Sequence, residues 1–158
     1  LHFVYDWTGG SRVAAAFSAV NESTWEHMKL LFIPFLVFTV AEFVVFSDAF
    51  RNFFAVKAAS ILLGLISIPA LYYTLTGMFG KLPSWVDMSI FFLADALTYF
   101  VSWRWLTAGR LRGGAMQLAG FIALWLVLFA FVWCTYRTPH LPLFLDPVSG
   151  CYGLETAC

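Results

Sequence analysis

Residues 115–136 have the sequence AMQLAGFIALWLVLFAFVWCTY, which contains no Asp, Glu, Lys or Arg. About 20 mostly apolar residues in a helix cross a hydrocarbon core of about 30 Å, because each helical residue adds about 1.5 Å. Three further stretches meet this criterion, and they cover residues 29–46, 53–76 and 86–107. Because backbone polar groups in lipid must be hydrogen-bonded within their own segment, all four stretches are predicted to be helices.

The composition supports an all-α transmembrane bundle. The chain is 61% hydrophobic and 11% charged, whereas a soluble domain is about 45–50% apolar and about 25% charged. This difference excludes a soluble globular domain. The links at residues 47–52, 77–85 and 108–114 are short, so neighbouring spans are expected to be antiparallel. We expect one transmembrane domain over residues 1–158, with residues 137–158 as a tail.

The charges suggest partners and an orientation. Nine basic and nine acidic residues leave no net charge, so nucleic acid is not an expected partner. Membrane lipid is the expected partner. Assembly into an oligomer or a larger complex is left open. Bases gather in and beside two of the short links: Arg51, Lys57, Arg104, Arg110 and Arg112. By the positive-inside rule this side is cytoplasmic. The sequence therefore predicts an integral membrane protein with both ends of the chain extracytoplasmic.

The amino-terminal region contains two apolar segments that are too short to span. Residues 1–5, LHFVY, resemble the end of an apolar segment, which predicts a fifth span before residue 1. Whether such a span was removed as a signal sequence or is missing from this sequence is left open. Residues 13–20, VAAAFSAV, are interpreted as an interfacial or re-entrant helix.

All three histidines, His2, His27 and His140, fall on the predicted extracytoplasmic side. Residues 21–29, NESTWEHMK, bring Glu22, Glu26 and His27 together just before the first span. In a helix Glu22 and Glu26 share one face, and His27 is displaced by about 100°. This pattern suggests metal ligands and a general base on one helix, although it is not the HExxH motif.

A structural interpretation of the same segment is equally available. Ser23 followed by Glu26 fits a capping box, in which each side chain accepts a hydrogen bond from the other residue's backbone N–H. Trp25 would then be an anchor at the membrane interface, and Lys29 a side chain extending to that interface. For Glu26 the capping role and the site role are evenly balanced, whereas His27 has no capping role and favours a site.

The tail sequence TPHLPLFLDPVSGCYG, residues 138–153, places His140 just beyond the last span and Asp146 six residues later. Its three prolines favour extended or turn geometry, so the tail can fold back as a lid over the bundle. An ordinary interfacial tail is the alternative. Cys151 and Cys158 could form a disulfide there, whereas Cys134 is interpreted as a buried apolar residue.

Polar residues within the spans have their own interpretation. Glu42, Lys57 and Arg104 lie at a similar depth, and pairing among them is expected because an isolated charge in lipid is costly. Asp95 lies near the middle of its span. It is either a protonated packing residue, bonded to Ser60, Ser67 or Thr98, or part of a polar path for protons or a substrate.

The segments HFVYDWTGG, NESTWEHMKLLFIP and TPHLPLFLDPVSGCYG together resemble a family of small bacterial integral membrane proteins of uncharacterised function. The most specific part is NES-x-WEH-x-K. The resemblance covers nearly the whole chain and implies a protein of the bacterial plasma membrane with five spans, one of them before HFVYDW. It implies no activity.

The leading functional hypothesis is a membrane-embedded, metal-dependent enzyme, a hydrolase of a lipid or another amphipathic substrate. A divalent metal such as Zn²⁺ would be bound by His27 and His140, with His2, Glu22 and Asp146 as the further candidates. The metal would activate a water, and Glu26 would be the general base. The alternative is a small transporter or accessory membrane subunit in which the same residues form a structural hydrogen-bond network. No GxGxxG, P-loop, GxSxG or CxxCH motif is present.

Overall fold

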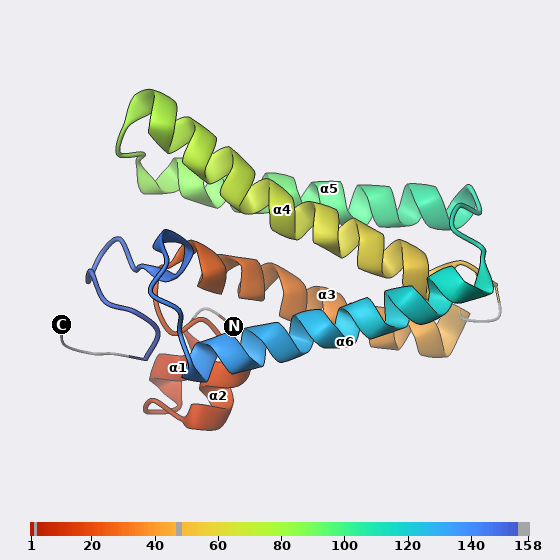
Figure 1. The fold of residues 1–158 in the computed structure, drawn as a ribbon, viewed down its shortest axis with the longest axis horizontal. Helices are drawn as coiled ribbons and strands as arrows, with labels where there is room; N and C mark the ends of the chain where they lie inside the picture. Colours follow the sequence, from red (N-terminus) through yellow and green to blue (C-terminus); the bar gives the residue numbers. More distant parts are fainter. Residues whose placement is uncertain (2, 47–48, 155–158) are drawn as a thin grey trace. The chain divides into compact units, whose positions relative to one another are not determined.

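The computed structural model describes residues 1, 3–46 and 49–154, and its main elements are four long helices. They are α3 (Thr24–Phe46), α4 (Phe53–Phe79), α5 (Ser84–Thr107) and α6 (Gly114–Tyr136), shown in Figure 1. All four are long and apolar enough to cross a membrane. The predicted all-α class with four spans is therefore confirmed.

The limits of the predicted spans agree with these helices to within a few residues. The largest difference is at the start of α3, which begins at Thr24 rather than residue 29. Polar residues precede the apolar run there, and the side chain of Asn21 accepts a hydrogen bond from the N–H of Ser23 at 3.0 Å. α4 runs on to Phe79 and ends at Gly80, whose φ of 77° is readily adopted by glycine.

The remaining helices are short. α1 (Val4–Trp7) and α2 (Arg12–Phe17) precede α3, and the 3₁₀ helix η1 (Pro142–Phe144) lies in the tail. At four and six residues, α1 and α2 are too short to span a bilayer. The predicted short helix at residues 13–20 is therefore present as α2, although it begins at Arg12 and ends at Phe17. His2, Ser47, Asp48 and residues 155–158 lie outside the described residues.

The chain divides into two compact units. Unit 1 comprises Leu1–Ile33 and Leu126–Cys158, and unit 2 comprises Pro34–Trp125. Unit 1 has an aromatic core: the rings of Trp25 and Phe131 are 4.6 Å apart, and those of Phe32 and Phe131 are 5.3 Å apart. The ring of Trp25 also lies 4.7 Å from the ring of Phe144 in the tail, so the tail folds back onto α3.

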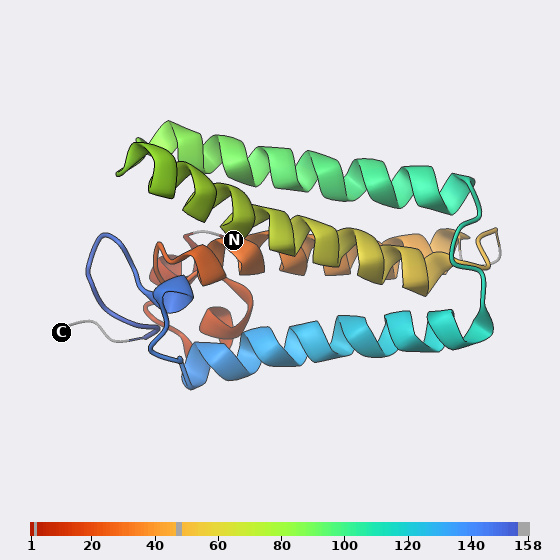
Figure 2. The same ribbon diagram turned by 45° about the horizontal axis from the view of Figure 1, so that its top comes forward.

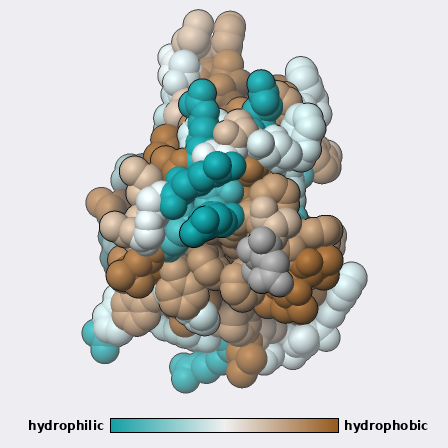
Figure 3. Space-filling view, turned by 90° about the vertical axis from the view of Figure 1, so that its right-hand side faces the viewer, coloured by the Kyte–Doolittle hydropathy of each residue, from teal (hydrophilic) through white to brown (hydrophobic). Residues whose placement is uncertain are grey.

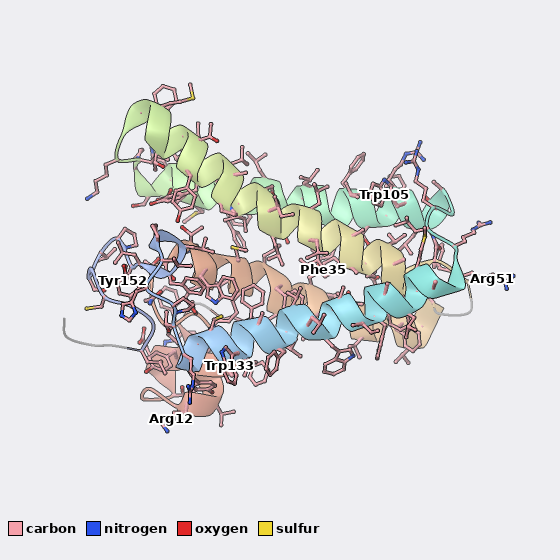
Figure 4. The ribbon with its side chains drawn as sticks, viewed as in Figure 1. Arg12, Phe35, Arg51, Trp105, Trp133 and Tyr152 are labelled. Carbon is pink, nitrogen blue, oxygen red and sulfur yellow. The ribbon has the colours of Figure 1, made fainter. Side chains whose placement is uncertain are left out.

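In unit 2, α4 and α5 lie side by side along their length, as Figures 1 and 2 both show. The links before α4 and after α5 are joined by Asn52, whose side chain is buried. Its Nδ2 donates to the carbonyl oxygen of Trp105 at 3.0 Å and to that of Arg110 at 2.8 Å. Figure 3 views this end, where hydrophilic side chains gather among apolar ones. The exposed Arg51, labelled with Trp105 in Figure 4, belongs to the same end.

Helices α4 and α6 approach each other closely at Gly120. A Cβ added at this glycine would lie 2.6 Å from backbone atoms of Phe54 and Ala55. One turn earlier, the side-chain oxygen of Gln117 accepts a hydrogen bond from the N–H of Ala55 at 3.2 Å. This bond satisfies a donor in the first turn of α4 that has no partner within its own helix. The contact between α4 and α6 therefore depends on a residue without a side chain.

We predict that Gly120→Ala separates these helices and lowers stability by about 1–3 kcal/mol, the usual cost of overpacking. Gly77→Ala is the matched control, since nothing lies within 4 Å of its added Cβ. That change should be neutral or stabilising by up to about 1 kcal/mol, because alanine favours helix. Unfolding in detergent micelles compares the two variants. Equal stabilities would contradict the close approach.

Candidate functional site

A buried ion pair lies at the start of α3. Lys29 Nζ is 2.7 Å from Glu26 Oε2, and the two side chains are 0% and 3% exposed. Charged side chains are almost never buried to this degree unless they are paired, because an isolated ion loses its hydration. The interpretation of Lys29 as a side chain that extends to the membrane interface is therefore wrong.

The ammonium group of Lys29 joins three elements of unit 1. Besides Glu26 on its own helix, Nζ donates to the carbonyl oxygen of Ala15 in α2 at 2.8 Å and to Thr135 Oγ1 in α6 at 3.0 Å. A lysine ammonium has three N–H donors. All three are thus used, and the hydrogen bonds connect α2, α3 and α6.

Glu26 extends this network to the segment between α2 and α3. Its Oε2 accepts a hydrogen bond from the N–H of Val20 at 3.1 Å. The capping box is only half formed: Ser23 Oγ accepts from the N–H of Glu26 at a long 3.4 Å, but the Glu26 carboxylate does not return to Ser23. The ammonium of Lys29 offers a stronger, charge-assisted bond, which explains the different direction of this carboxylate.

Trp25 is partly buried and packs against aromatic residues of unit 1. Its ring contacts Phe131 and Phe144, as described above. The tail is tied down nearby, because Asn21 Nδ2 donates to the carbonyl oxygen of Gly153 at 3.1 Å. At the other side of unit 1, the hydroxyl of Tyr136 donates to the carbonyl oxygen of Arg12 at 2.6 Å. Arg12 is labelled on α2 in Figure 4.

His27 lies beside the network and is partly exposed. Its Nδ1 is 3.0 Å from the carbonyl oxygen of Ser23, and its Nε2 is 3.7 Å from Glu22 Oε2. The side chains of His27 and Glu22 are 29% and 43% exposed. These two predicted ligands are therefore brought together at the surface of unit 1.

His140 and Asp146 are held within the tail. The exposed ring of His140 lies 4.6 Å from the ring of Tyr152, which is labelled in Figure 4, and the two rings are tilted by 53°. Asp146 is buried and organises its own turn: its carboxylate accepts hydrogen bonds from the N–H of Val148 at 2.8 Å and from Ser149 Oγ at 2.6 Å. Such bonds are typical of an aspartate that stabilises a turn.

The predicted metal ligands are thus only partly assembled. Within residues 1, 3–46 and 49–154, no group of three His, Cys, Asp or Glu side chains is arranged to hold a metal ion. His2, the remaining predicted ligand, lies outside the described residues, as does Cys158 of the possible disulfide with Cys151. The zinc site stays a prediction.

A second ion pair lies in unit 2 and answers a question that the sequence left open. Of the two bases expected as partners of Glu42, Lys57 and Arg104, it is Lys57 of α4 that pairs with it. The three hydroxyls considered as partners of Asp95 each donate to a carbonyl oxygen of their own helix: Ser60 to that of Lys57, Ser67 to that of Gly64 and Thr98 to that of Ala94.

The four helices that are long and apolar enough to cross a membrane, with one buried and one partly buried ion pair, are the features of a polytopic helical membrane protein. The chain matches the family of unknown function DUF6512 over residues 1–154, and it belongs to this family. This agrees with the expected resemblance to an uncharacterised family. No curated protein and no solved structure matches the chain.

The sequence analysis did not identify Lys29 and Thr135 as partners of each other. The spacing of Glu26 and Lys29, three residues apart, was a usable indication, because such residues are neighbours on a helix. Thr135 is separated from Lys29 by 106 residues, and no local pattern joins them.

We predict that Glu26→Gln and Lys29→Met each lower the free energy of unfolding by about 3–5 kcal/mol, since each leaves a buried charge without its partner. The double variant should lose clearly less than the sum, because neither charge remains. Lys81→Met, at an exposed lysine, is the control and should change stability by less than about 0.5 kcal/mol. Additive losses in the double variant would show that the two side chains are not coupled.

Proposed function

We propose that this chain is a non-enzymatic membrane protein of the accessory-subunit class, and that its polar cluster in unit 1 is a structural network. The observation that carries the proposal is the complete use of the Lys29 donors by Glu26, Ala15 and Thr135. A network with every donor used stabilises one arrangement of its elements. In this role Glu26 and Lys29 hold the segment that contains α2 against the ends of α3 and α6.

The surroundings of Glu26 support this role over that of a general base. A general base has to reach a water or substrate proton within hydrogen-bond distance. The Glu26 side chain is 3% exposed, and its Oε2 already accepts bonds from Lys29 and Val20. A carboxylate buried to this degree has little access to the water or substrate from which a general base takes a proton.

The surface of the amino-terminal segment supports contact with lipid or with a partner subunit. Trp7 is 80% exposed, Val13 is 73% exposed and Phe17 is 45% exposed. Trp7 belongs to α1, whereas Val13 and Phe17 belong to α2, the element that the Lys29 network joins to α3 and α6. An apolar surface on a short, firmly held element suits insertion into the membrane interface or contact with a larger complex.

The metal-dependent hydrolase is the second candidate, and the pair of His27 and Glu22 favours it. Imidazole and carboxylate groups 3.7 Å apart on a partly exposed surface are two of the ligands that Zn²⁺ uses. His2 and His140 would have to supply the rest. In that case another residue would have to act as the general base in place of Glu26.

Metal analysis of the full chain, purified in detergent and dialysed against Zn²⁺ at a low, buffered concentration, separates the two candidates. The proposal predicts no stoichiometric zinc in the native chain, and equal metal content in His27→Ala and His140→Ala. About one zinc per chain that is lost in His27→Ala, with folding retained, would overturn the proposal and support the enzyme.

We also propose that the basic links at residues 47–52 and 108–114 face the cytoplasm and that the tail faces the opposite side. A cysteine introduced by Val148→Cys, at a position 79% exposed, should then react with a membrane-impermeant maleimide on intact cells. A cysteine introduced by Ala108→Cys should react only after permeabilisation. Labelling of the native chain measures the background reaction of its own cysteines. The reverse pattern would invert the orientation.

A further inference from the structure

Unit 2 contains a cavity of about 200 Å³ beside the second ion pair. Its walls come from α3, α4, α5 and the link before α4. The lining residues are Glu42, Phe50, Lys57, Tyr99, Ser102, Trp103, Leu106 and Thr107. Half of them are apolar or aromatic, and the other half are charged or polar side chains from three helices. Concave sites with this composition are typical of small-molecule binding.

Lys57 brings hydrogen-bond donors to this cavity. The residue is 2% exposed and its ammonium pairs with Glu42. The rings of Phe35 and Phe53 lie 5.2 and 5.6 Å from Nζ, close enough for cation–π contact. Among the described residues Glu42 supplies the ion-pair contact to an ammonium that has three donors. In contrast to Lys29, Lys57 therefore keeps donors for a ligand.

Ser102 is the second polar group of the cavity, and its lack of a hydrogen bond is unusual for a hydroxyl of this helix. Its Oγ is buried and has no hydrogen-bond partner among the described residues, with the residue 1% exposed. Thr98 and Thr107 on the same helix donate to carbonyl oxygens four residues earlier, at 2.8 and 2.9 Å. A buried hydroxyl without a partner is costly and calls for an explanation.

The charge and the walls of the cavity restrict the ligand. Glu42 neutralises Lys57, so an uncharged molecule with oxygen acceptors fits better than an anion. Phe50, Tyr99 and Trp103 offer aromatic faces to a planar ring. Trp103 is 61% exposed, and it lies on a helix that is apolar enough to span the membrane. The rim at Trp103 would therefore open towards lipid, and a ligand would enter from there.

We propose that this cavity binds the head of a lipid-soluble quinone. The quinone carbonyl oxygens accept hydrogen bonds from Lys57 Nζ and Ser102 Oγ, the planar ring packs against the aromatic walls, and the apolar tail passes over Trp103 into the bilayer. This site lies in unit 2, whereas the structural network lies in unit 1. The two proposals therefore stand or fall separately.

The test is equilibrium binding of a benzoquinone with a decyl tail to the full chain in detergent. We expect one saturable site per chain. Ser102→Ala should weaken binding about fivefold, since one hydrogen bond to the carbonyl is lost. The matched control is Thr98→Val, which removes a buried hydroxyl of the same helix outside the cavity lining. Its affinity should stay within about twofold of the native chain.

A second readout protects the test against a loss of folding. Without quinone, Ser102→Ala should unfold at the native temperature or above it, because it removes a buried hydroxyl that has no partner. Binding that is not saturable, or equal affinities for Ser102→Ala and the native chain, would overturn the proposal. Displacement of the quinone by phosphatidylcholine at equal concentration would also overturn it, because the cavity would then prefer the ester carbonyls of a lipid.

Discussion

A lysine buried at the end of a membrane helix has to find acceptors for all its N–H donors, and the architecture of unit 1 depends on how Lys29 does so. Its three acceptors come from α2, α3 and α6. A short helix such as α2 has little stability of its own. Its carbonyl at Ala15 and the nearby N–H of Val20 are instead held by charged groups, which make stronger hydrogen bonds than neutral ones. The aromatic contacts of Trp25 then bring the tail onto the same unit.

The two buried lysines illustrate two uses of a charge in a membrane protein. Lys29 is paired with Glu26 and completed by two further acceptors, so it stabilises a single arrangement. Lys57 is paired with Glu42, packs against aromatic rings and lines a cavity next to an unpartnered serine hydroxyl. Ionisable residues within membrane helices mark either structural pairs or sites. The number of acceptors around each lysine distinguishes the two cases in this chain.

The helices were predictable from the sequence because runs of apolar residues have to be helical in lipid, and α3 to α6 follow the predicted spans closely. The partners of the polar residues were not. Glu26 and Lys29 are three residues apart, but Thr135 and Ala15 join them only through the tertiary fold. Asp146 is predicted as a ligand from its residue type, and in the structure its carboxylate accepts hydrogen bonds from its own turn. Residue type alone does not distinguish a carboxylate that binds a ligand from one that stabilises a turn.

The central claim is that Lys29 holds the amino-terminal segment in place, and amide hydrogen exchange of the full chain in detergent measures this directly. If Lys29→Met is compared with the native chain, the account predicts much faster exchange in peptides covering residues 11–21, where Ala15 and Val20 lie. Peptides from the middle of α4 should exchange at the native rate. Unchanged exchange over residues 11–21 would contradict the claim, because the segment would then be held by other contacts.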